Sequence, residues 1–373
     1  MKIRISVKRH IKNSVGLLVV VGGMAVVGAS LLRSSQAATP FITAEVENGT
    51  ISAPAAQISD AGAAGGRAVV FAAAAAPPTG TSRTLNCAPA AAATMTNAVS
   101  HLCGFPDATN TGITAGTVLK RVPQDITSGA GWHYDSRGWI AVDTAGAVFN
   151  GIDTSLNVDV TANNVTVQNS RIKSSGENFG ISVRHASNVI LQNNEISGTD
   201  SAGGRLLVTI KDIYGDAANL HVLKNNLYYT STAIQMDDGL IQDNYIHDMG
   251  LIAGDHINGT TSGGGTAPMI VRHNTSFNQF SQTDAISLFE DFGVQTNKTI
   301  DNNLVAGGGY CIYAGQNAGG AATSNIKVTS NHFSRLFYPN CGDFGPVTAY
   351  SATGSGNVFS GNIWDDTGAA VGL

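Results

Sequence analysis

The chain has 373 residues, of which 26 are acidic and 21 are basic. Six basic residues and no acidic ones lie in the first 37 positions, so the rest carries 15 basic against 26 acidic side chains, a net charge near −11. This excess of acid argues against nucleic-acid binding, which needs a basic surface to neutralise phosphates. A polyanionic ligand would require a local basic patch or a bridging metal ion.

The first 37 residues have the three parts of an export signal. Basic residues lie between Lys2 and Lys12, an apolar stretch runs from Val15 to Leu32, and small residues follow around Ala37. The apolar stretch is also near the lower limit for spanning a bilayer, so an uncleaved membrane anchor is the alternative. In both cases we expect the rest of the chain to be secreted or held at the cell surface, without a further membrane segment.

The next two segments precede the main repeat. Residues 38–86 are rich in Ala, Gly, Pro, Ser and Thr, a composition typical of a spacer. Residues 87–143 are expected to form an N-terminal cap and the first coils. Within them, the Ala-rich stretch from Pro89 to Leu102 predicts a short capping helix, which would cover exposed strand edges.

Residues 144–373 repeat one short unit, in which an alternating strand is followed by an Asn-containing bend and an apolar anchor. NVTVQNSRI from Asn164 and NVILQNNEI from Asn188 are two examples. The anchors span 191 residues in seven steps: Ile172, Ile196, Leu227, Ile246, Phe277, Leu304, Phe333 and Ile363. A period of this length indicates a solenoid, and alternation with period two excludes the helical kinds.

Asn recurs two residues before the anchor, at Asn194, Asn225, Asn244, Asn302 and Asn331. Asn readily adopts the left-handed angles of a tight bend, and its amide can bond to the same Asn one coil away. With this ladder, residues 144–366 resemble the pectate-lyase-like superfamily. The resemblance implies an all-β fold, a right-handed parallel β-helix (solenoid) of about nine to ten coils.

The repeat also predicts which residues face outward on the first strand of each coil. We place these strands at Gly180–His185, Leu207–Asp212, Ala233–Asp238, His256–Thr260, Ala285–Glu290, Cys311–Gln316 and Val347–Tyr350. One outward column is then Ser182, Thr209, Gln235, Asn258, Ser287 and Tyr313, and the other is Arg184, Lys211, Asp237, Thr260, Phe289 and Gly315. Since coils stack about 4.8 Å apart, Arg184, Lys211 and Asp237 would be consecutive neighbours.

In the superfamily that the chain resembles, the first-strand face binds polysaccharide, and we expect a polysaccharide ligand here. The polar and aromatic candidates for contact with it are Gln235, Asn258, Asp284, Tyr310 and Tyr313. The candidates for chemistry are Lys211, Arg184, Asp237, Asp255 and His256. No organic cofactor is implied.

Two reactions and one binding role are compatible with this face. β-Elimination of a uronan needs a base and a cation, which Lys211 and Arg184 could supply, and it is preferred because basic and acidic residues lie side by side. Ca²⁺ prefers oxygen ligands, and the candidates are Asp237, Asp238, Asp255 and Asp284. Inverting hydrolysis would instead use two of these carboxyl groups about 6.5–9.5 Å apart. An adhesive surface protein would use the face only for binding.

Four cysteines are consistent with an oxidising compartment, where an even number usually indicates disulfides. Cys311 opens a first strand and Cys341 lies about one coil later, so we expect these two to pair. Cys87 and Cys103 are then left to pair with each other. We expect the protein to be a monomer.

Overall fold

The computed structural model describes residues 55–59, 67–71, 104–317 and 319–373. The chain divides into two units, residues 1–74 and 75–373. In the first unit, β1 (Ala55–Ser59) and β2 (Arg67–Phe71) form an antiparallel pair. The predicted export signal, the capping helix and the Cys87–Cys103 pair lie outside the described residues.

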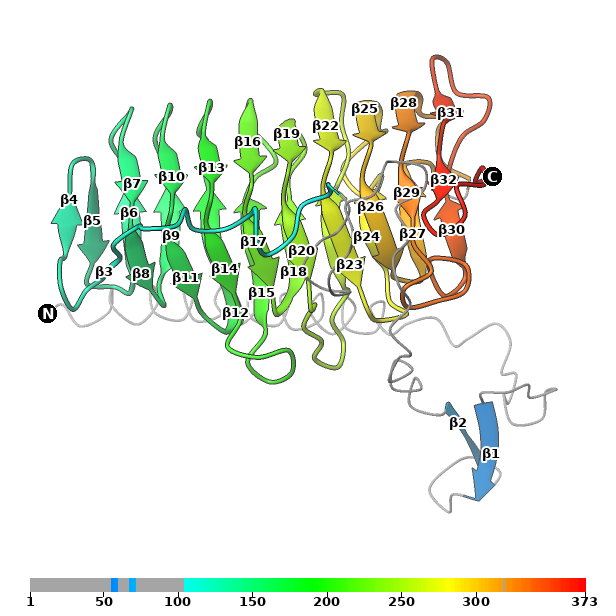
Figure 1. Ribbon diagram of the computed structural model, residues 1–373, viewed down its shortest axis with the longest axis horizontal. Coiled ribbons are helices and arrows are strands. Elements are labelled where there is room, and N and C mark those ends of the chain that lie inside the picture. The colour runs from blue at the N-terminus through cyan, green and yellow to red at the C-terminus, as the bar shows by residue number, and fades with distance from the viewer. Residues whose placement is uncertain (1–54, 60–66, 72–103, 318) are drawn as a thin grey trace, which may run out of the picture. The chain divides into compact units, whose positions relative to one another are not determined.

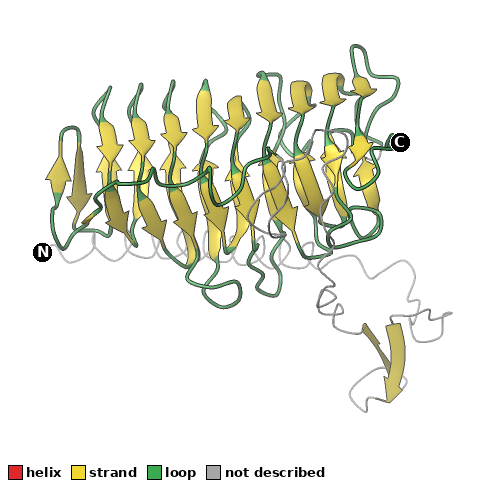
Figure 2. Ribbon diagram, viewed as in Figure 1, coloured by secondary structure: helices red, strands yellow, loops and turns green. Residues whose placement is uncertain are grey.

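In the second unit, strands stack into a parallel β-solenoid of about nine turns (Figure 1). The turns build three sheets of nine, ten and 11 strands. Neighbouring strands are parallel except at the N-terminal end, where β4, β5 and β6 pair antiparallel. No helix occurs in the described residues (Figure 2), which confirms the all-β class and the number of coils. The right-handed sense stays a prediction.

The strand bounds follow the three sheets. The nine-stranded sheet contains β7 (Val148–Asn150), β10 (Thr166–Gln168), β13 (Ile190–Gln192), β16 (Leu220–Leu223), β19 (Gly239–Gln242), β22 (Met269–Arg272), β25 (Thr296–Asp301), β28 (Ser324–Thr329) and β31 (Val358–Ser360). The ten-stranded sheet contains β3 (Lys120–Arg121), β8 (Ile152–Thr154), β11 (Arg171–Lys173), β14 (Glu195–Ser197), β17 (Asn226–Tyr228), β20 (Tyr245–His247), β23 (Thr275–Asn278), β26 (Leu304–Gly307), β29 (His332–Phe333) and β32 (Ile363–Trp364).

The 11-stranded sheet carries the first strands that the repeat predicts. It contains β4 (Ser128–Gly129), β5 (Trp132–Asp135), β6 (Trp139–Val142), β9 (Asn157–Val160), β12 (Gly176–Val183), β15 (Leu206–Asp212), β18 (Thr230–Gln235), β21 (Asn258–Ser262), β24 (Asp284–Leu288), β27 (Tyr310–Ala314) and β30 (Gly345–Thr348). Its outer face is therefore the predicted polysaccharide face.

Stacks of branched apolar side chains fill the interior. Ile181, Ile210 and Ile234 occupy equivalent positions of consecutive coils and are fully buried. Burying one such side chain contributes about 1.5–3 kcal/mol, so each added coil extends the same favourable contacts. Thr260 takes the equivalent position in β21 and is also buried. Its predicted outward position was therefore wrong.

A ladder of buried asparagines runs along the solenoid, with Asn303 in place of the predicted Asn302 and with Asn274 and Asn362 as further members. In each member except the last, Asn362, the backbone N–H and the side-chain amide both donate to the Oδ1 of the next Asn, at 2.9–3.0 Å. The members are Asn194, Asn225, Asn244, Asn274, Asn303, Asn331 and Asn362. Asn302 is not among them, because it precedes the ladder residue and takes the left-handed φ of 51° at the bend.

Residues 104–119, here called the strap, cross the outside of the ten-stranded sheet (cyan in Figure 1). The backbone carbonyl of Pro106 in the strap accepts a hydrogen bond from Thr275 Oγ1 (2.6 Å). The backbone N–H of Gly112 in the strap donates one to Lys224 O (2.9 Å). Phe105 of the strap completes a second apolar cluster that includes Phe277 and Leu304.

The strap explains why two of the apolar anchors do not face the interior of the solenoid. Phe277 and Leu304 are buried, but in the cluster with Phe105 of the strap. Ser276 and Val305 instead align with Ile246 and Phe333 at the anchor position. Leu304 and Val305 are both apolar, and beside Phe277 the inward residue is the polar Ser276, so the apolar pattern does not show which residue faces the interior when a segment covers the sheet from outside.

The Cys311–Cys341 disulfide is confirmed, with Cα atoms 6.0 Å apart. It joins β27 to the segment before β30, and both cysteines are fully buried. This covalent link secures the C-terminal coils, where there are few further strands to pack against.

Candidate functional site

The outer face of the 11-stranded sheet contains two adjoining pockets, which together we call the groove. The first, here the Lys211 chamber, has a volume of about 580 Å³, and its lining includes Lys211, Tyr214, Gln235, Asp237, Gly263, Gly264, Gly265 and Phe292. The second, here the Asn258 chamber, has a volume of about 460 Å³ and is lined by Thr232, Gln235, His256, Asn258, Thr261, Thr283, Phe289 and Asp291. Gln235 lines both, so the chambers are neighbours along the solenoid.

The outward column of the groove differs from the predicted one. Lys211 pairs with Ser182 on one side and Gln235 on the other, and Gln235 pairs with Thr261. Thr261 takes the place predicted for Asn258 in this column, a displacement of three residues that turns Thr260 inward. The predicted run of Arg184, Lys211 and Asp237 was also wrong, because on both sides of Lys211 the coils are displaced by two residues from the predicted register. An even displacement keeps every side chain on the same face, so the alternation of apolar residues could not reveal it. Gln235, Ser287 and Tyr313 do share one outward column, as predicted.

Lys211 is the cation of the Lys211 chamber. Its Nζ lies 5.4 Å from the centre of the Phe179 ring, and within the described residues it forms no ion pair with a carboxylate at contact distance. Partial burial lowers the pKa of Lys211, an effect that the charge of Asp212 only partly opposes. Such an amine loses its proton more easily than an exposed lysine.

Arg184 lies near the same chamber but has a different environment. Its Nε donates to Asp159 Oδ1 at 2.6 Å, and this hydrogen bond raises the pKa of Arg184. Its guanidinium carbon is 6.0 Å from the ring centre of Tyr214, which lines the chamber. Tyr214 is 58% exposed, and its ring stacks on that of His185 with the ring centres 4.3 Å apart.

Asp237 organises the glycine loop of the Lys211 chamber. Its Oδ1 accepts hydrogen bonds from Ser262 Oγ (2.7 Å), Gly263 N (2.8 Å) and Gly264 N (3.4 Å). Its backbone carbonyl accepts a bond of 2.7 Å from the buried Nζ of Lys298. These contacts give Asp237 a part in positioning the loop, and its catalytic role stays a prediction.

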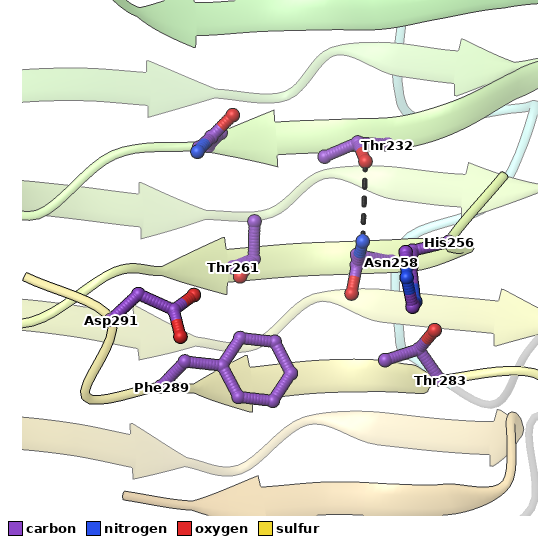
Figure 3. Close-up of a pocket in the computed structure, with 8 residues that line it drawn as sticks. Thr232, His256, Asn258, Thr261, Thr283, Phe289 and Asp291 are labelled. Atoms are coloured by element: carbon purple, nitrogen blue, oxygen red, sulfur yellow. Dashed lines mark hydrogen bonds between the residues drawn. The ribbon is translucent and has the colours of Figure 1, made fainter. Parts of the chain in front are cut away.

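Asp255 and His256 lie in the loop before β21. Arg205 binds both oxygens of Asp255 at 2.7 and 2.8 Å, and Ser231 Oγ adds a third contact at 2.7 Å. Burial alone would raise the pKa of Asp255, but the bonds from Arg205, Ser231 and Ile252 N hold it at about 2. His256 lines the Asn258 chamber, next to Asn258 (Figure 3).

Two acceptor oxygens at the wall of the Asn258 chamber have no donor in the described part of the chain. Asn258 donates from Nδ2 to Thr232 Oγ1 at 3.3 Å, which directs its Oδ1 toward the next coil (Figure 3). That oxygen and Thr283 Oγ1 are buried without a hydrogen-bond partner. Thr283 also has a φ of 47°, a strained value for a β-branched residue. Unpartnered polar atoms and backbone strain cluster at functional sites.

Asp284 follows Thr283 and pairs with Asn258 in the neighbouring strand. Burial raises the pKa of Asp284 well above its usual range, and the Ser287 hydroxyl and Gly259 amide only partly oppose the shift. Neither carboxyl oxygen has a hydrogen bond of good geometry, and the side chain is fully buried. A neutral carboxylic acid fits these surroundings better than a carboxylate.

Aromatic rings continue the groove beyond the Asn258 chamber. Phe289 and Tyr313 lie 5.5 Å apart between ring centres, Tyr313 and Tyr310 5.6 Å, and Tyr310 and Phe344 5.8 Å. Phe292 and Phe344 are 83% and 68% exposed. Tyr310 and Tyr313 were among the predicted ligand contacts. Phe292 and Phe344 were missed because they lie in loops outside the repeat.

The four predicted Ca²⁺ ligands do not form a cluster. Within the described ranges, no group of three or more His, Cys, Asp or Glu side chains lies close enough to hold a metal ion. Asp237 and Asp255 are bound by N–H donors, and Asp238 accepts a bond from Asn219 N at 3.2 Å. Ca²⁺ binding stays a prediction.

Comparison of the chain with models of protein families, with curated proteins and with solved structures gives no match. Among the described residues, no helix is long and apolar enough to cross a membrane.

Proposed function

We propose that this protein is an exported member of the pectate-lyase-like superfamily that binds an acidic polysaccharide in the groove and cleaves it by β-elimination. The solenoid and its Asn ladder support the superfamily, and the N-terminal pattern with the Cys311–Cys341 disulfide supports export. The exposed aromatic rings support a carbohydrate ligand, since a flat ring packs against the apolar face of a sugar.

The observation that supports this reaction is that two basic residues near one chamber have surroundings that shift their pKa values in opposite directions. Burial lowers the pKa of Lys211, whereas Asp159 keeps Arg184 charged. Environments that push two pKa values apart are typical of an acid–base division of roles. Lys211 is therefore the base, and Arg184 neutralises the carboxylate of the uronic acid.

The reaction proceeds through loss of one proton and one C–O bond. The neutral amine of Lys211 removes the proton from the carbon beside the substrate carboxyl group, and that electron pair forms a carbon–carbon double bond. The neighbouring C–O bond breaks, and the leaving oxygen takes a proton from solvent. The products are a new reducing end and an unsaturated sugar that absorbs in the ultraviolet.

The test combines a panel of uronans and neutral glycans with a matched pair of variants. Lys211→Arg keeps the charge but removes the base, and we expect it to keep ligand affinity while turnover falls by about a hundredfold or more. Lys327→Arg is the control, because Lys327 is exposed on β28 of the nine-stranded sheet. It should cleave as the wild type does.

The products separate the three possible roles. Ultraviolet-absorbing products that disappear in Lys211→Arg support the proposal. New reducing ends without ultraviolet absorbance would establish hydrolysis instead. Tight binding without either product would establish an adhesive protein and reject the enzymatic proposal.

A further inference from the structure

The two chambers of the groove differ in charge. In the Lys211 chamber the carboxylates are already bound by N–H and O–H groups. Asp212 accepts bonds from Gly215 N (3.1 Å) and Ala217 N (3.0 Å), and Asp237 holds the glycine loop. Lys211 is thus the basic group of this chamber that remains for a ligand, and the guanidinium of Arg184 lies beside Tyr214 at its wall, so the chamber suits an anionic sugar.

The Asn258 chamber has the opposite character. Its lining, which lies wholly in the described residues, contains no lysine or arginine. It presents the exposed carboxylate of Asp291, with the apolar ring of Phe289 beside it (Figure 3). A uronate in this chamber would meet a like charge without a compensating cation, which is unfavourable.

The hydrogen-bonding groups of the Asn258 chamber also favour a neutral sugar. Asn258 Oδ1 and Thr283 Oγ1 are acceptors without a donor. The amide oxygen of Asn258 can only accept, so at this position it suits a sugar hydroxyl and not a carboxylate.

From these differences we infer that the ligand is a mixed polysaccharide, in which a uronic acid residue in the Lys211 chamber is joined to a neutral sugar in the Asn258 chamber. The inference rests on the proposed function, because it assigns the substrate of the same groove. Coils stack about 4.8 Å apart, so chambers that share Gln235 can hold consecutive sugars of a chain lying along the solenoid.

Calorimetric titration of the full chain with four hexasaccharides tests the inference. The probes are galacturonate hexamer, alternating galacturonate–rhamnose, alternating glucuronate–N-acetylglucosamine, and cellohexaose. Both the wild type and Lys211→Arg are titrated, so that turnover does not obscure binding. At least one alternating probe should bind at least tenfold more tightly than galacturonate hexamer and than cellohexaose.

A charge-neutral variant tests the Asn258 chamber directly. Asp291→Asn removes the like charge, so the ratio of the affinity for galacturonate hexamer to the affinity for the preferred alternating probe should rise threefold or more. Asp125→Asn, which alters an exposed carboxylate paired with Arg121 outside the groove, is the control and should change neither affinity.

The outcomes distinguish the two proposals. If galacturonate hexamer binds as tightly as the alternating probes, or if Asp291→Asn leaves this affinity ratio unchanged, the mixed-polysaccharide inference is rejected and uronan cleavage stands. If cellohexaose binds as tightly as every uronate-containing probe, the groove does not select acidic sugars, and the proposed function fails with it.

Discussion

Arg205 and Asp255 form a bidentate ion pair in which the arginine side chain is 1% exposed and the carboxylate 11% exposed. The same guanidinium also donates to Gly176 O at 2.9 Å and to Glu177 Oε1 at 2.6 Å. The pair therefore connects the loop before β21 to the start of β12, across coils that are far apart in the sequence. It places the loop that carries His256 beside the Asn258 chamber.

Loss of the Asp255 charge should destabilise the fold. Removing one partner of a buried ion pair leaves the other charged and unpaired, which costs about 3–5 kcal/mol. We expect Asp255→Asn to lower the free energy of unfolding by this amount in urea titrations. Asp125→Asn, in an exposed pair with Arg121, should have no measurable effect. An Asp255→Asn protein as stable as the wild type would show that the pair is not structural.

The contribution of Asp255 should depend on pH in one direction. Its pKa is lowered from 3.8 to about 2 in the folded protein, so the stabilisation is present above the unfolded pKa and is lost as pH falls through the folded one. The stability difference between wild type and Asp255→Asn should be constant above about pH 5 and shrink toward pH 2. Urea titrations at several pH values measure it, and an equal difference throughout would contradict the lowered pKa.

Asp284 should behave in the opposite way. Its pKa is raised by burial, so as pH rises above the unfolded value the carboxyl group increasingly penalises the folded state. Asp284→Asn removes a buried ionisable group and should stabilise the protein by about 1–3 kcal/mol at pH 7, with a smaller gain at pH 4. Ser287→Ala is the companion variant, because the Ser287 hydroxyl lies near the Asp284 carboxyl group and partly opposes the rise in its pKa. A loss of stability in Asp284→Asn at pH 7 would mean that the carboxylate is bound by a partner.

The pH dependence of turnover should report Lys211. Because the base must be neutral, the rate should rise with pH, and its midpoint should lie below 10.5, the ordinary pKa of lysine, since burial lowers the pKa of Lys211. Phe179→Ala would admit water beside the amine, so the midpoint should move upward. A rate that falls with pH over this range would exclude Lys211 as the base.

The sequence alone determined the solenoid and most of its interior. Alternating strands with a regular period and recurring asparagines leave few other folds, because each coil buries the same face against its neighbours. Cys311 and Cys341 were also predictable, since about one coil of chain brings them within bonding distance. One outward column was assigned correctly at Gln235, Ser287 and Tyr313, because the coils between these residues have equal lengths.

Only the tertiary structure decided the register of the groove and the state of its charges. A displacement of two residues leaves the apolar alternation intact. The sequence therefore does not show whether Lys211 pairs with Gln235, as it does in the structure, or with Asp237. Likewise, the pairing of Asp255 with Arg205 joins residues 50 positions apart through loops that have no repeat. Contacts made by such loops follow from the three-dimensional course of the chain, which local patterns do not encode.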